Sequence, residues 1–65
     1  MWLAVNKDGQ EVIMDNKPER FNNKWKSLVF IGPGYYDTSM ILPKGTIKKL
    51  TGKELTWDDE PLKFG

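Results

Sequence analysis

The chain has 65 residues, which corresponds to a single small globular domain, residues 1–65. It contains no cysteine and no histidine, which excludes disulfide bonds and metal sites built on thiolate or imidazole ligands. The net charge is +1 and hydrophobic residues make up 38% of the chain, so we expect a small, aromatic-rich core in a monomer or in a homodimer that completes it.

The first fifteen residues predict a β-hairpin. Two apolar runs flank Asp8-Gly9, a dipeptide favoured in type I′ turns because both central residues take positive φ. With this dipeptide as the loop, Val5 opposes Val12. We therefore expect strands near residues 2–7 and 10–15 to pair antiparallel. The face expected to point toward the core carries Leu3, Val5, Val12 and Met14.

Residues 16–24 form a polar connection with one proline and three asparagines. Because it is longer than a usual hairpin loop, we expect it to be either mobile or functional. The next segment, 25–31, ends in the continuous apolar run 28–31, which is typical of a strand buried on both faces. Gly32-Pro33-Gly34 is expected to turn the chain into a second strand over 35–42.

Residues 43–51 predict one short helix with both ends marked. Pro43 suits the first helical position, and Gly52 suits the left-handed residue that follows a helix. Ile47 and Leu50 lie three residues apart and form a narrow apolar face. We expect the helix to dock through this face.

The last part of the chain is acidic and irregular. Asp58-Asp59-Glu60 is the only carboxylate cluster, and three consecutive residues rarely converge on a hard cation, so a turn or helix start capped by Thr56 is preferred to a metal site. Trp57 is expected to cover the apolar helix face, and an exposed anchor for a partner is the alternative. A final strand is expected at 62–64.

Together these elements predict an α+β or mostly β fold. We expect a small curled antiparallel sheet of four or five strands, SH3-like or a partly open barrel, with one short helix. No apolar run approaches the roughly 18 residues of a membrane span, and residues 1–6 lack the basic leader of a signal peptide. We therefore expect a cytoplasmic protein without membrane association.

The segments 42–50 and 52–61 resemble the C-terminal signature of short proteins from gut Bacteroidetes and their phages. Asp8-Gly9 and the element Lys17-Pro18-x-Arg20 are similar to the same group, so the resemblance covers most of the chain. It implies a phage or mobile-element origin and a compact fold. Because those proteins have no established activity, the resemblance implies no chemistry.

Basic residues combined with aromatic residues give the sharpest functional hint. Residues 16–53 hold eight basic and two acidic side chains, a local balance of 8 − 2 = +6. Proteins that bind single-stranded nucleic acid combine a cationic groove with aromatic stacking, but a small domain also uses such residues for its core and its solvated surface. The candidate binding surface consists of Lys17, Arg20, Lys24, Trp25, Lys48 and Lys49.

No motif for catalysis or for a cofactor is present. Nucleophilic catalysis commonly pairs a hydroxyl or thiol with a base, and neither histidine nor cysteine is available. Our first hypothesis is therefore a non-enzymatic accessory protein that binds another protein. The alternative is a weak nucleic-acid-binding module using the basic loop and helix. The low net charge and the carboxylates of 54–60 argue against specific nucleic-acid affinity.

Overall fold

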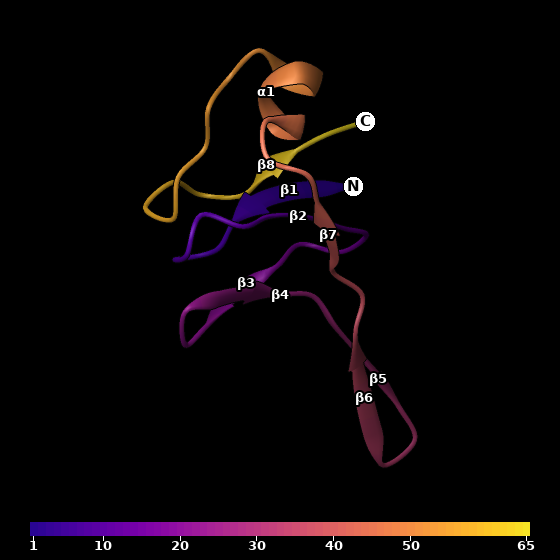
Figure 1. The fold of residues 1–65 in the computed structure, drawn as a ribbon. Helices are drawn as coiled ribbons and strands as arrows, with labels where there is room; N and C mark the ends of the chain where they lie inside the picture. The colour runs from indigo at the N-terminus through magenta and orange to yellow at the C-terminus, as the bar shows by residue number, and fades with distance from the viewer.

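Eight short strands and one helix follow one another along the chain in the computed structural model, which describes residues 1–65 (Figure 1). The elements are β1 (Trp2–Val5), β2 (Glu11–Met14), β3 (Glu19–Phe21), β4 (Lys24–Lys26), β5 (Leu28–Ile31), β6 (Gly34–Asp37), β7 (Met40–Leu42), α1 (Thr46–Thr51) and β8 (Leu62–Lys63). No helix is long and apolar enough to cross a membrane. The predicted fold class is confirmed, because antiparallel strands dominate and one short helix accompanies them.

The strands form three separate antiparallel sheets and do not close into a barrel. The central sheet has the strand order β7-β2-β1-β8, while β3 pairs with β4 and β5 pairs with β6 as two-stranded hairpins. The central sheet has the expected four strands, but the eight strands divide among three sheets instead of curling into the expected SH3-like or partly open barrel. In the central sheet, β8 lies beside β1, and the N–H of Phe64 donates to the carbonyl of Met1 at 2.8 Å. The two chain ends are thus neighbours (Figure 1).

The predicted β1–β2 hairpin is confirmed, but its register differs by one residue. Ala4 opposes Val12, and Val5 opposes Glu11. The connection uses the five residues 6–10, in which the N–H of Gly9 donates to the carbonyl of Asn6. Because neighbouring positions on a strand point to opposite faces, this shift divides the four predicted core residues between the two faces. All four are nevertheless buried: Leu3, Val5, Val12 and Met14.

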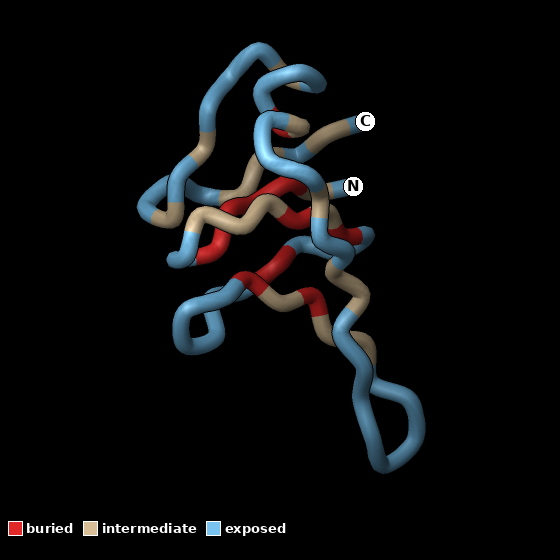
Figure 2. Tube along the Cα trace, viewed as in Figure 1, coloured by how far each residue is buried: buried red, intermediate tan, exposed pale blue.

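The central sheet is covered on both faces, which gives the protein two small apolar clusters. One cluster joins Ala4, Val12, Met14 and Trp25. The other joins Leu3, Val5 and Ile47. Helix α1 therefore covers one face of the sheet and the β3–β4 hairpin covers the other (Figure 1). Figure 2 shows the buried residues gathered mainly on the central sheet and on the part of the chain around β4.

Helix α1 begins three residues later than predicted. Gly45 precedes it with φ 87°, and Gly52 ends it with φ 76° and donates its N–H to the carbonyl of Lys48, as the left-handed C-terminal residue was expected to do. Docking through Ile47 is confirmed because this side chain is only 2% exposed. Docking through Leu50 is wrong, since that side chain is 48% exposed. A six-residue helix turns too little surface toward the sheet to bury both.

The polar connection 16–24 contains an unpredicted strand. β3 and β4 pair across a turn at Asn22-Asn23, and Asn22 adopts φ 58°, which asparagine tolerates better than most residues. The hairpin is held to the sheet because the backbone N–H of Trp25 donates to the buried Asn6 side chain at 2.8 Å. Only the middle of the hairpin reaches the core, and its outer residues stay exposed.

The predicted second hairpin forms, but its strands are shorter and more exposed than expected. The turn at Gly32-Pro33 joins β5 to β6, and the chain breaks again at Thr38-Ser39 before β7 joins the central sheet. The prediction that residues 28–31 are buried on both faces is wrong: the first two are half-buried and the last two are exposed. Figure 1 shows this hairpin extending away from the sheet.

Candidate functional site

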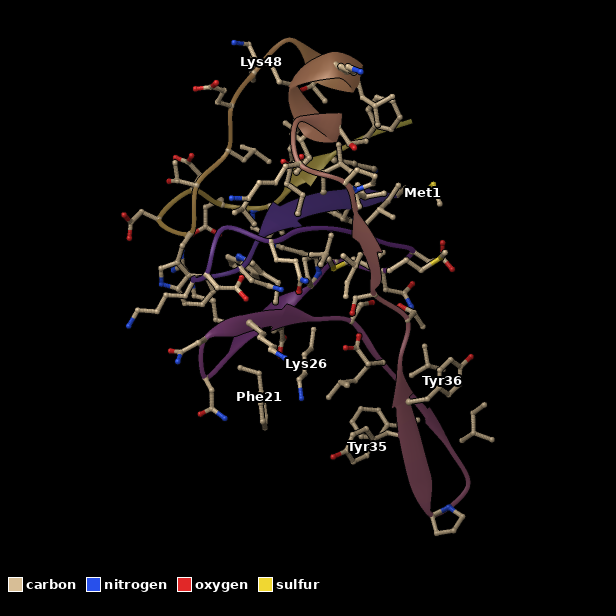
Figure 3. The ribbon with its side chains drawn as sticks, viewed as in Figure 1. Met1, Phe21, Lys26, Tyr35, Tyr36 and Lys48 are labelled. Atoms are coloured by element: carbon tan, nitrogen blue, oxygen red, sulfur yellow. The ribbon has the colours of Figure 1, made fainter.

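The structure separates the six predicted binding residues into two groups. Lys17, Arg20, Lys24 and Trp25 lie on or beside the β3–β4 hairpin, whereas Lys48 and Lys49 lie on α1 at the other face of the sheet. In Figure 3, Lys48 lies at the top of the molecule, and Phe21 and Lys26 lie well below it, beyond the central sheet. One continuous basic groove therefore does not connect the two groups.

Trp25 and Arg20 contribute to internal packing. The Trp25 side chain is 4% exposed, so its ring faces the core and is covered. The Arg20 guanidinium lies 4.7 Å from the centre of the Trp25 ring and 4.9 Å from that of Trp57, and it donates to the Trp57 carbonyl at 2.7 Å. The two indoles themselves are tilted by 59° with centres 5.8 Å apart. This cluster attaches the C-terminal loop to the β3–β4 hairpin.

The prediction that Trp57 covers the helix is wrong. Its side chain packs on the opposite face of the sheet, against the cluster that contains Trp25. Leu55 takes the expected place and packs against the cluster that contains Ile47. The acidic segment beyond it forms a turn in which Thr56 donates its N–H to the Asp59 carboxylate at 2.8 Å. The predicted cap had the Thr56 side chain as acceptor. The observed bond runs the other way, because the Asp59 carboxylate accepts and the Thr56 N–H donates. No group of three potential metal ligands occurs.

On α1, the Lys48 ammonium forms an ion pair with Glu54 at 3.4 Å, and both side chains are largely exposed to solvent. A pair of this kind contributes little to stability. A shallow hollow of about 290 Å³ lies beside the start of the helix. The carboxylate at its edge, Glu11, already accepts N–H donation from Gly45 and Ile47, at 2.6 Å and 2.8 Å.

The β5–β6 hairpin carries four large exposed apolar side chains, including Phe30, the most exposed of the protein. Phe30 is 74% exposed and Tyr35 is 65% exposed, and they form a tilted pair with ring centres 5.8 Å apart. Ile31 and Tyr36 are exposed on the opposite face of the ribbon, as the register requires. Figure 3 shows Tyr35 and Tyr36 pointing to opposite sides of the hairpin. Both faces of this ribbon are therefore apolar and open.

β7 also carries exposed apolar side chains, and the stretch from β5 to β7 contains almost no charge. Met40 and Ile41 on this strand are about two-thirds exposed, at 68% and 67%. Asp37 is the one charged residue between positions 27 and 43. We call the exposed side chains of this stretch the hairpin surface; they are Phe30, Ile31, Tyr35, Tyr36, Met40 and Ile41.

Asp37 fixes the base of the hairpin. Its carboxylate accepts the N–H groups of Ser27 and Ser39 at 3.2 Å and 3.0 Å, and the Ser39 hydroxyl at 2.8 Å. Thr38 closes the same junction, donating its N–H to the Ser27 carbonyl at 2.8 Å. Burial raises the pKa of this carboxyl, but the donors on Ser39 and Ser27, with the charge of Lys26, outweigh burial and hold the pKa below its usual value. The hairpin therefore leaves the sheet from a fixed junction.

A notch of about 220 Å³ separates the β5–β6 hairpin from the β3–β4 hairpin. Its lining residues are Lys17, Glu19, Phe21, Lys26, Leu28 and Phe30. The Lys26 ammonium lies 5.0 Å from the centre of the Phe21 ring, so the notch has an aromatic wall with one cation over it. Phe21 is itself half-exposed.

Sequence reasoning did not identify the hairpin surface. The continuous apolar run 28–31 was the available signal, and it was interpreted as a core strand. Comparison with protein families, curated proteins and solved structures finds no match for this chain. The site is therefore defined by its geometry alone.

Proposed function

We propose that the chain is a non-enzymatic accessory protein that works by binding a protein partner through the hairpin surface. The observation that carries this proposal is the group of large apolar side chains on β5, β6 and β7 that no other part of the chain covers. Large exposed apolar side chains gathered on one part of a small protein usually mark an interaction site. Aromatic residues and methionine are also the residue types enriched at interfaces.

The charge distribution supports a protein partner over a nucleic acid. A nucleic-acid site needs cations beside its stacking rings. Residues 27–36 hold no charge, and the cations that line the notch with Phe21 and Phe30, Lys17 and Lys26, share it with the carboxylate of Glu19. The basic residues lie on two different faces of the molecule, with Arg20 already packed between two indoles. A phage or mobile-element origin, which the sequence resemblance implies, and a cytoplasmic location belong to the same proposal.

Capture on immobilised protein tests the proposal. The tagged chain is bound to a resin and exposed to a cell lysate that also contains the untagged chain. We expect a stoichiometric protein to be retained, lost when Phe30→Lys is introduced, and kept with the control Leu50→Lys, which places the same charge on exposed α1. If nothing is retained, or if both variants behave alike, the proposal is wrong.

Titration with single-stranded and duplex oligonucleotides tests the alternative. Binding that depends on phosphate contacts weakens steeply with salt. We expect no complex to survive at about 0.15 M salt. A submicromolar complex at that salt, weakened by Lys24→Glu and by Lys48→Glu, would favour the nucleic-acid module instead.

A further inference from the structure

We infer that the partner of the hairpin surface is a second copy of this chain. Two β5–β6 hairpins would pack together about a two-fold axis, with the face that carries Phe30 and Tyr35 against the same face of the other copy. This contact would also close the notch beside Phe21, whose lining carries charges of both signs, from Lys17, Glu19 and Lys26. The inference rests on the proposed function, because it names the occupant of the same surface.

The apolar pattern of β5 first indicates that this strand packs against another surface on both of its faces. Residues 28–31 are all apolar, a pattern that belongs to strands covered on both faces. Within one chain the ribbon is open on both faces, and neither outer edge pairs with another strand. The chain's own core cannot supply the cover, because its buried apolar residues are committed to the two faces of the central sheet.

The chain also exposes more surface than its size predicts for a monomer. The chain exposes 4687 Å², whereas a monomer of 7.5 kDa is expected to expose about 4,250 Å². The contacting face would bury the two exposed rings Phe30 and Tyr35, with half-exposed Phe21 beside the notch, and aromatic side chains supply the largest buried area per residue. A 65-residue chain with two small core clusters also gains the most from association.

The lack of charge favours a second copy over a different protein. Heterologous interfaces commonly select their partner by complementary charge, and the tip and strands over 27–36 offer none. An apolar ribbon of this kind can pack against the same ribbon of a second copy about a two-fold axis, which is the commonest symmetry of soluble oligomers. Edge strands that stay monomeric usually carry lysine or inward charges, whereas the one charge on this ribbon is Asp37 at its base, where Ser27 and Ser39 hold the carboxylate.

Sedimentation equilibrium of the purified full chain tests the inference. We expect a monomer–dimer equilibrium between about 1 μM and about 500 μM. Phe30→Lys and Tyr35→Lys should each raise the dissociation constant at least about tenfold, whereas Leu50→Lys should leave it unchanged. The fluorescence of the Trp25–Trp57 pair, which lies outside the hairpin, reports whether each variant is folded. If one of the two hairpin variants does not fold, the dissociation constant of the other still tests the inference.

Two outcomes would overturn the inference. One is a monomer over the whole concentration range, and the other is a dimer that both hairpin variants leave intact. A monomeric chain that still captures a different protein through Phe30 would overturn the second copy as occupant and leave the proposed function standing. A monomeric chain that captures nothing would contradict both the second copy as occupant and the proposed function.

Discussion

Glu11 is the single residue that joins the helix to the sheet by hydrogen bonds. Both of its carboxylate oxygens accept backbone N–H groups at the start of α1, where Gly45 has no side chain to act as a cap. Free N–H groups at a helix start need such acceptors. The partners are 34 and 36 residues apart in sequence, so no local motif announces this cap.

Replacing Glu11 tests the cap. Glu11→Ala should lower the free energy of unfolding by about 1–2 kcal/mol, as the loss of a helix cap usually does. Glu11→Gln keeps one acceptor oxygen, so its free energy of unfolding should lie between those of the native chain and Glu11→Ala. Asp15→Ala is the matched control, because that exposed carboxylate accepts no hydrogen bond. Urea denaturation measures all three, and equal stability of the Glu11→Ala and Asp15→Ala variants would contradict the cap.

The elements themselves follow from local chemistry where that chemistry is decisive. Asp8-Gly9 predicts the β1–β2 hairpin, and Gly52 predicts the end of the helix. The hairpin register was missed because Asn6 starts the turn and its side chain reaches Trp25, a long-range contact. β3 was missed because its strand is short and polar and is stabilised by the Arg20–indole contacts.

The docking of α1 depends on one side chain. Ile47→Ala should lower the free energy of unfolding by about 2–4 kcal/mol, because the side chain is buried against Leu3 and Val5. Leu50→Ala, on the same helix but half-exposed, should cost less than about 1 kcal/mol. Thermal and urea denaturation compare the two. Equal losses would mean that the helix docks through both residues.

The junction at Asp37 makes part of the stability depend on pH. Its pKa is lower in the folded chain than the ordinary value of 3.8, so the carboxylate stabilises the fold above that pH. The stabilisation is lost as the pH falls through the lowered folded value. The free energy of unfolding should therefore fall more between about pH 5 and about pH 2 in the native chain than in Asp37→Asn.

Asp15→Asn provides the control for this pH dependence, since it removes a carboxylate that holds nothing in place. Urea unfolding at a series of pH values measures the difference. If Asp37→Asn keeps the full pH dependence of the native chain, its carboxylate does not hold the hairpin junction.

At the scale of the whole molecule, a small core explains the projecting hairpin. Ten of 65 residues are buried, and the apolar ones lie against the two faces of the central sheet. The radius of gyration is 11.6 Å, against about 10.8 Å expected for this length, and the longest extent is 39 Å. The apolar pattern of the sequence predicts where strands lie, but it does not predict which strands pack against the core. For that reason the fold class was predictable and the hairpin surface was not.

Nuclear magnetic resonance of the isotope-labelled chain at increasing concentration tests most directly that the hairpin surface binds a second copy. Each backbone amide reports on its own surroundings, so the contact can be located along the chain. We predict concentration-dependent shifts confined to residues 28–41, with smaller shifts at Phe21 and none on α1. Shifts on α1 without shifts in the hairpin, or a spectrum independent of concentration up to about 1 mM, would contradict the account.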